Sequence, residues 1–434
     1  MVNRQIRLPV ELWVAICGLL SPKDQRSLAK SCTRLFAIVH LNPPSTVVRI
    51  DHWRVRSTGS KSKDRLHLRS ATEVHWRGWK HNQGENKRFH AVLSVLPTVS
   101  NICLLSLRDV EINKAQQAII FGLSTLRTLV VHSCRFYPST KPLPLSPVTA
   151  LKVSDTDEET IRRLLTLLAT TLESLEVDSS TICSTLQGGL IELPKLSTFT
   201  INRDQHSFSA PNLAMLDTFK RYTSITTISI FCYYSLSEIP FHHSDLPALC
   251  SLTCDDQLAM IMIPKRPVTT YVEIGHLRKP GQLDLLNALS KTRARITRLT
   301  LFVPYETRSV LPSLATYLQH LEQLTLRSNA IMPWSPQAGI ILPKLKWVTV
   351  WIIPRDWTSR FEWLLEHIIP TCPALEVLEY LGTLSEYSMT HNLPPVSRRA
   401  WRVQRLPDGS WERLGPPPIP TPPAPLCGQL PAAP

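Results

Sequence analysis

Two histidines and a carboxylate, His242, His243 and Asp245, come nearest in this sequence to a metal-binding cluster. Adjacent residues of an extended segment point in opposite directions, so the two imidazoles would not face one ion. No further ligand is spaced to join them. We therefore expect residues 242–245 to form a surface loop that holds no metal.

A zinc site would need cysteines at suitable spacing. The closest pair of the ten cysteines is Cys250 and Cys254, which have three residues between them. A structural zinc site takes four ligands, commonly as two such pairs, and the sequence has no second pair. Several cysteines instead fall at apolar positions of periodic segments, where a thiol packs as a small hydrophobic group. We expect free thiols and no metal, which is typical of a protein of the cytoplasm or the nucleus.

Acid–base catalysis and nucleotide binding would each leave a recognisable pattern. The adjacent acids Asp157, Glu158 and Glu159 precede apolar residues at helical spacing and suit a first helical turn, which predicts a helix over residues 157–168. The glycines form no nucleotide-binding loop, and the pair Gly188-Gly189 is typical of a turn. No Gly-x-Ser-x-Gly sequence occurs. The sequence therefore predicts no catalytic residue and no cofactor.

The charge of the chain is concentrated in one segment. The 434 residues include 48 Lys and Arg against 34 Asp and Glu, which gives a formal net charge of +14. Half of this excess lies in residues 49–90, which hold eleven basic and four acidic residues. Such a segment could contact an acidic partner or a nucleic-acid backbone; the alternative is a solvated loop. No run of eighteen apolar residues occurs, so we expect no membrane span.

From residue 96 onward the dominant feature is a repeated pattern of the form apolar-x-x-apolar-x-apolar. Successive starts differ by 24, 22, 24, 24, 29 and 24 residues up to Leu249, and by 25, 24 and 30 from Ile296 onward. A period near 24 falls in the range of leucine-rich repeats. The members are Ile102/Leu105/Leu107, Leu126/Leu129/Val131, Val148/Leu151/Val153, Leu172/Leu175/Val177, Leu196/Phe199/Ile201, Ile225/Ile228/Ile230, Leu249/Leu252/Cys254, Ile296/Leu299/Leu301, Leu321/Leu324/Leu326, Leu345/Val348/Val350 and Leu375/Leu378/Tyr380, with weaker ones at Ala71/Val74/Trp76 and Val268/Tyr271.

This pattern predicts the fold class. The last two apolar residues of each member are two apart, so they point to one side of a strand. A strand with one apolar face cannot bury that face alone, but parallel stacking of successive strands makes a continuous core. We expect an α/β protein, an irregular leucine-rich-repeat solenoid with a parallel strand arc and helices or loops on its convex side. The position that is Asn or Cys in such repeats is kept at Cys134 and Asn329.

The first forty residues carry a separate helical pattern. Leu8, Leu12, Ile16 and Leu19 recur at steps of four, four and three, which draws one apolar stripe. The sequence Ser21-Pro22-Lys23-Asp24 then gives the cap, proline and acid that begin a second helix. The alternative for these residues is a small helical cap on a larger domain.

The order of these residues over positions 4–44 resembles the F-box motif: Leu-Pro-x-Glu-Leu, Ile, Leu-Leu, Ser-Pro-x-Asp, Leu, Cys and Leu-Phe. Gln25 departs from the leucine expected beside Asp24. The resemblance implies docking to the adaptor Skp1, and through it to a cullin-based ubiquitin ligase. The residues it implies for the Skp1 contact are Leu8, Pro9, Leu12, Ile16, Leu19, Leu20, Leu28 and Phe36.

These patterns divide the chain into five parts. They are an F-box at 1–44, a basic linker with a first irregular repeat at 45–95, the solenoid at 96–392, a hairpin at 393–414 and a disordered Pro-rich tail at 415–434. The Asp408-Gly409 dipeptide predicts the turn of the hairpin, with Trp401, Val403 and Trp411 on one side.

Taken together with the resemblance, this organisation implies the substrate-recognition subunit of a Skp1–cullin–F-box ubiquitin ligase, a non-catalytic receptor whose repeats bind an unknown substrate protein. The alternative is a scaffold that degrades nothing, or a nucleic-acid-binding protein that uses residues 49–90.

The strand positions opposite the apolar pair should line the concave surface of the solenoid. Most are small and polar, but late in the array they become larger. Arg327, Trp347 and Trp351 are of the residue types that dominate binding energy, so we interpret them as a substrate-contact patch. The alternative is that the hairpin folds over the two tryptophans and buries both.

Overall fold

The fold was analysed in a computed structural model. It describes residues 24, 46–51, 71–78, 93–94, 96, 101–138, 144, 146–178, 191–202, 222–230, 242, 245–273, 282–302, 310–328, 342–352, 366, 368–382 and 399–414. The chain forms two compact units, Met1–Ser224 and Ile225–Pro434.

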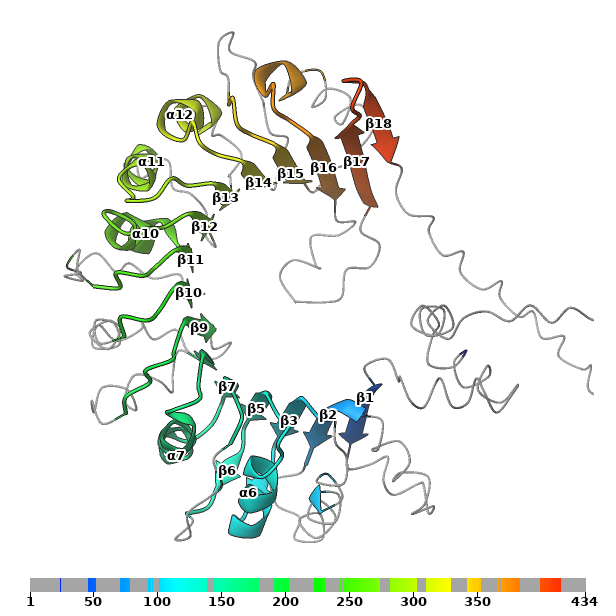
Figure 1. The fold of residues 1–434 in the computed structure, drawn as a ribbon, viewed down its shortest axis with the longest axis vertical. Coiled ribbons are helices and arrows are strands. Elements are labelled where there is room, and N and C mark those ends of the chain that lie inside the picture. The colour runs from blue at the N-terminus through cyan, green and yellow to red at the C-terminus, as the bar shows by residue number, and fades with distance from the viewer. Residues whose placement is uncertain are drawn as a thin grey trace, which may run out of the picture. The chain divides into compact units, whose positions relative to one another are not determined.

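The first unit is a stack of parallel strands, each hydrogen-bonded to the next (Figure 1). Two helices, α6 (Lys114–Phe121) and α7 (Glu158–Leu168), lie together on one face of it. A second small sheet pairs β4 (Glu111–Ile112) with β6 (Arg135–Phe136). The strands of the stack are β1 (Thr46–Asp51), β2 (Ala71–Arg77), β3 (Leu104–Arg108), β5 (Thr128–His132), β7 (Ala150–Ser154), β8 (Ser174–Asp178) and β9 (Thr198–Asn202).

The second unit repeats this plan and ends differently. Its parallel strands are β10 (Thr227–Ile230), β11 (Ser251–Cys254), β12 (Thr270–Glu273), β13 (Arg298–Phe302), β14 (Gln323–Ser328), β15 (Trp347–Ile352) and β16 (Val377–Gly382). The helices α10 (Asp256–Met262), α11 (Gln282–Ser290) and α12 (Val310–Tyr317) lie side by side on one face. Two antiparallel strands, β17 (Arg399–Arg405) and β18 (Trp411–Leu414), complete the sheet.

The repeated apolar residues are the core of both units. Every residue of the predicted triplets whose side chain the structure describes is buried. Register places equivalent residues side by side: Leu105, Leu129, Leu151, Leu175 and Phe199 lie in one row across five strands. The expected leucine-rich-repeat-like solenoid is thus confirmed in each unit by its own strand register. The predicted helix over 157–168 is α7, whose buried residues include Ile161, Leu164, Leu165 and Leu168.

The structure describes one of the two residues at the Asn or Cys position of the repeat, Cys134. Cys134 is buried, and its Sγ donates to the carbonyl oxygens of Leu107 (3.4 Å) and His132 (3.2 Å). The thiol therefore joins its own repeat to the preceding one, which contains Leu107. Asn329 lies outside the described residues.

The hairpin forms as two strands around a tight turn. Gly409 has φ of +86°, a conformation that favours glycine. The Asp408 carboxylate accepts hydrogen bonds from the Ser410 backbone N–H (2.9 Å) and hydroxyl (2.6 Å), and these bonds lower the pKa of Asp408. In register, Val403 and Trp411 share the face that carries buried Leu378, as predicted, and the side chain of Trp401 lies outside the described part of the chain.

The sheet of the first unit begins at Thr46, before the first strong repeat triplet at Ile102. Strands β1 and β2 both precede residue 96, and they pair in parallel with each other and with β3. In residues 1–44, where the sequence resembles an F-box, only Asp24 is described; its backbone is helical and its side chain is exposed. The predicted Skp1-contact residues, the cations Lys61, Lys63 and Arg65, and the tail at 415–434 lie outside the described residues.

Candidate functional site

The face of the second unit opposite the helices carries a row of small polar side chains. Register aligns Ser229, Thr253, Val272, Thr300, Thr325 and Thr349 across neighbouring strands, as the repeat pattern predicted for most of them. The row continues into Glu379 on β16 and Arg402 on β17. The small side chains therefore give way to a charged pair where the parallel strands end.

The end of this row is a network of contacting side chains. The Trp347 indole N–H donates to Thr349 Oγ1 at 3.0 Å, and the Thr349 hydroxyl donates to Glu379 Oε2 at 3.3 Å. Glu379 Oε1 lies 4.0 Å from Arg402 Nε. The Arg402 guanidinium lies over the Trp347 ring, 5.0 Å from its centroid. We call these four residues, together with Arg327, the C-terminal patch.

Arg327 and Trp351 lie on the same face, one row further along the strands. The register pairs Phe302 with Arg327 and Arg327 with Trp351. Arg327 is half-buried, and burial lowers the pKa of its guanidinium. The side chain of Trp351 lies outside the described part of the chain, so its backbone register alone places it beside Arg327.

The hairpin does not lie flat over this face. Strand β17 pairs edge to edge with β16, so it extends the sheet (Figure 1). One of its residues, Arg402, covers part of the Trp347 ring, and Trp347 remains half-buried. The ring is thus held by a cation on one side and by Thr349 at its N–H, which orients it without enclosing it.

Three members of the C-terminal patch were not identified from the sequence. Thr349 was expected only as a small lining residue, and Glu379 occupies the corresponding position of the next repeat. That position could have been read from the spacing within Leu378–Tyr380. Arg402 could not have been found this way, because its place depends on how the hairpin pairs with β16.

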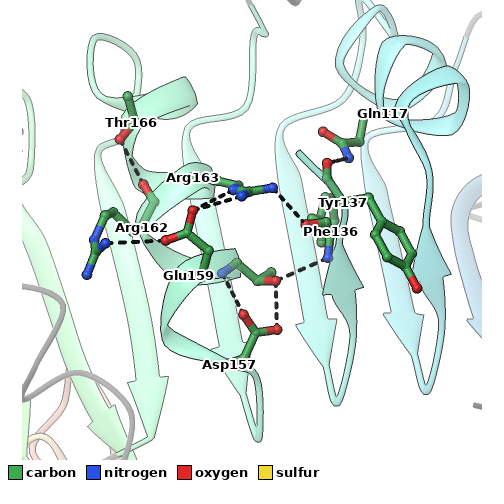
Figure 2. A network of polar contacts seen from close by, with 9 residues as sticks. Gln117, Phe136, Tyr137, Asp157, Glu159, Arg162, Arg163 and Thr166 are labelled. Carbon is green, nitrogen blue, oxygen red and sulfur yellow. Dashed lines mark hydrogen bonds and ion pairs between the residues drawn. The ribbon is translucent and has the colours of Figure 1, made fainter. Parts of the chain in front are cut away.

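Two of the adjacent acids at 157–159, Asp157 and Glu159, belong to a structural network in the first unit that Figure 2 shows. Asp157 caps α7: its carboxylate accepts the Thr160 backbone N–H at 2.9 Å and the Thr160 hydroxyl at 2.8 Å. Thr160 Oγ1 in turn accepts the Phe136 backbone N–H at 3.1 Å. Asp157 therefore fixes both the start of the helix and a strand of the preceding repeat.

The other two acids are paired along the helix surface. Glu158 contacts Arg162 at 2.8 Å, and Glu159 contacts Arg163 at 2.8 Å. Arg163 also donates to the Phe136 carbonyl oxygen at 3.2 Å, which ties α7 to β6 a second time (Figure 2). These contacts account for the three acids as helix-terminal residues.

We expect Asp157→Ala to lower the free energy of unfolding by about 1–2 kcal/mol, because an N-cap is lost and the Thr160 hydroxyl loses its acceptor. Asp157→Asn, which can still cap, should retain most of the stability. Glu158→Gln is the matched surface control and should change it by less than about 0.5 kcal/mol. Urea unfolding followed by circular dichroism measures all three; equal effects of the Ala and control substitutions would contradict the capping role.

Of the residues considered for metal binding, the structure describes His242, Asp245, Cys250 and Cys254. No cluster of three or more His, Cys, Asp or Glu side chains suited to a metal occurs in the described ranges. His242 is exposed, and its backbone N–H donates to the Asp245 carboxylate at 2.8 Å. Cys250 is half-buried and Cys254 is buried; both are free thiols. His243 lies outside the described residues.

None of the helices described here has the length and apolarity that a bilayer crossing requires.

Comparison with known proteins finds similarity to solved structures. No protein-family model matches the sequence, and no curated protein matches it. The chain is similar to an internalin, InlF, from Listeria monocytogenes at 14% identity with a TM-score of 0.26, over 80% of this chain and 89% of that one. The description of this chain as a leucine-rich-repeat-like solenoid therefore follows from its own period, register and burial.

Proposed function

We propose that this chain is the substrate-recognition subunit of a Skp1–cullin–F-box ubiquitin ligase. The observation that carries the proposal is the order of two elements in one chain. The F-box-like pattern that contains Leu8, Pro9 and Leu12 precedes a solenoid whose sheet has a polar face free of described helices. The first element supplies an adaptor contact and the second a surface for another protein.

In this proposal the chain performs no chemistry of its own. It works by proximity, because holding a substrate beside a ubiquitin-charged enzyme raises the effective concentration of the substrate. The C-terminal patch suits the substrate contact, since it offers a half-buried tryptophan with a neighbouring arginine and carboxylate. Tryptophan and arginine are enriched among the residues that dominate interface energies.

The adaptor contact is tested by affinity capture of the wild-type chain beside a Leu8→Ala/Pro9→Ala variant. We expect wild type to retain Skp1 and a cullin, and the variant to lose both, because two residues of the predicted docking stripe are truncated. A loss of about tenfold or more is expected from two anchor residues at about 1–2 kcal/mol each.

Leu406→Ala serves as a control, because Leu406 is an exposed leucine in the hairpin turn and is not one of the predicted adaptor-contact residues. Capture of Skp1 without a cullin would instead favour a scaffold that degrades nothing. Salt-sensitive RNA capture that disappears when Lys61, Lys63 and Arg65 are neutralised would favour nucleic-acid binding through residues 49–90. No capture of Skp1 by wild type would overturn the proposal.

A further inference from the structure

A basic surface lies in the described part of the second unit, on the loops that precede its strands. The loop before β13 carries Lys291, Arg293 and Arg295 within five residues, and no acid lies among them. All three side chains are exposed. This loop is distinct from the basic segment at 49–90.

Neighbouring loops add further cations to this surface. The Lys265 backbone N–H donates to the Lys291 carbonyl oxygen at 2.9 Å, so these two lysines lie on adjacent loops. The Arg293 N–H similarly donates to the Arg266 carbonyl oxygen at 2.7 Å. Lys265 is exposed, and its φ of +64° fixes the turn that presents it.

On the other side, equivalent positions of three successive repeats are all basic. Arg295, His320 and Lys344 each directly precede the first buried residue of their repeat. Their repeats are neighbours, because the Glu322 backbone N–H donates to the Thr297 carbonyl oxygen and the Lys346 backbone N–H donates to the Glu322 carbonyl oxygen, both at 2.9 Å. Partial burial, then the charges of Arg295 and Lys344, lower the pKa of His320. We call Lys265, Lys291, Arg293, Arg295, His320 and Lys344 the basic edge.

The basic edge is short and has acidic neighbours. Glu322, Lys346 and Glu376 each follow the first residue of their repeat triplet. Lys346 lies between the two glutamates, because its backbone N–H donates to the Glu322 carbonyl oxygen (2.9 Å) and its carbonyl oxygen accepts from the Glu376 N–H (2.8 Å). No ion pair joins the exposed cations of the basic edge to an acid within the ranges that the structure describes. Among these residues, no acid neutralises the charge of the edge through an ion pair.

We propose that the basic edge binds an acidic polypeptide segment, rich in Asp or Glu, of the substrate protein. Neighbouring strands lie about 4.8 Å apart, so successive loops present cations at a spacing that carboxylates of one extended segment can reach. A long nucleic acid would continue past the edge onto Glu322 and Glu376, whereas a peptide with few carboxylates ends within it. The polypeptide nature of the occupant rests on the proposed receptor function.

The edge also adjoins the C-terminal patch. Register aligns Arg298, Gln323 and Trp347 on the face opposite the helices, and Arg298 belongs to the strand that follows the loop of Arg293 and Arg295. A bound segment could therefore place carboxylates at the edge and an apolar side chain at Trp347. This gives the substrate class a chemical description: an acidic stretch beside an aromatic or aliphatic residue.

The test measures binding of a fluorescent oligoglutamate peptide of about ten residues, roughly 33 Å when extended, to the purified full chain by fluorescence anisotropy. We expect binding that weakens as salt is raised. The variant Arg293→Gln/Arg295→Gln/Lys344→Gln should bind about tenfold more weakly, since three modest contacts are lost together. The control Arg77→Gln/Lys114→Gln/Lys195→Gln loses the same charge at exposed sites of the first unit and should change affinity less than about twofold.

Several outcomes would overturn the inference: no binding at low salt, binding that salt does not weaken, or equal losses in the variant and the control. Oligoglutamine should not bind. An oligouridine RNA that binds more tightly than oligoglutamate, and loses affinity in the same variant, would reassign the edge to nucleic acid. The assay contains no Skp1, so failure of the adaptor contact and failure of this surface are measured separately.

Discussion

Replacement of Arg266 by leucine should lower the free energy of unfolding of the second unit by about 3–5 kcal/mol. The side chain is 1% exposed, and its guanidinium donates to four backbone carbonyl oxygens. Nε bonds Asp245 O (2.7 Å), Nη1 bonds Ile261 O (3.3 Å) and Met262 O (2.8 Å), and Nη2 bonds His242 O (2.8 Å). Leucine would leave these acceptors without a donor.

The four acceptors explain why the expected effect is large. Ile261 and Met262 are at the C-terminal end of α10, where unpaired carbonyls carry the negative end of the helix dipole. His242 and Asp245 belong to the loop before β11, so one cation joins two segments. Burial lowers the pKa of Arg266, and the nearby Asp245 carboxylate raises it. In the wild type, the four hydrogen bonds offset the free-energy cost of burying the guanidinium charge.

Thermal and urea unfolding, with hydrogen exchange of residues 245–263, would measure this effect. Because repeat arrays can unfold in parts, exchange should rise first in α10 and in the loop before β11. Arg266→Lys keeps the charge but cannot present five donors in a planar fork, so it should lose about half as much stability. The exposed Arg293→Leu is the control, within about 0.5 kcal/mol of wild type. A loss below about 1 kcal/mol for Arg266→Leu would mean that water satisfies the carbonyls.

Local spacing was enough to predict the interior of the fold. A strand contributes its apolar residues at fixed offsets, and burial of the triplet at Leu321, Leu324 and Leu326 follows from that offset alone. The helix α7 was equally accessible, because its acids, cap and apolar stripe lie within twelve residues. The F-box-like segment, read from the same kind of spacing, lies almost wholly outside the described residues and stays a prediction.

Contacts between segments that are distant in sequence could not be predicted, because no pattern within either segment indicates that the two pair. Arg266 follows a lysine and precedes a proline, as a surface residue would, and its burial depends on carbonyls up to 24 residues away. The position of Arg402 depends on β17 pairing antiparallel to β16, at the point where the parallel repeat pattern ends. The candidate site was therefore half predictable: its tryptophan and arginine types were, and its geometry was not.

Replacement of Trp347 by alanine should weaken substrate capture about 30-fold, the effect of losing about 2 kcal/mol from a central interface residue. The ring is half-buried, is held at its N–H by Thr349, and has the Arg402 guanidinium against it. A partner side chain that packs on the exposed part of the Trp347 ring would contact a ring that Thr349 and Arg402 already hold in place. Trp347→Phe, which keeps a ring but loses the N–H bond, should lose less.

The measurement is the ratio of captured substrate to captured Skp1, so that Skp1 serves as an internal standard for a folded chain. Gln323→Ala is the matched control: Gln323 is the register neighbour of Trp347 on β14, faces the same side and is half-buried. We expect the ratio to fall in Trp347→Ala and to stay within about twofold of wild type in Gln323→Ala. If both variants capture as much substrate as wild type, the substrate binds elsewhere on the chain, because a tryptophan at the centre of the contact cannot be removed without loss.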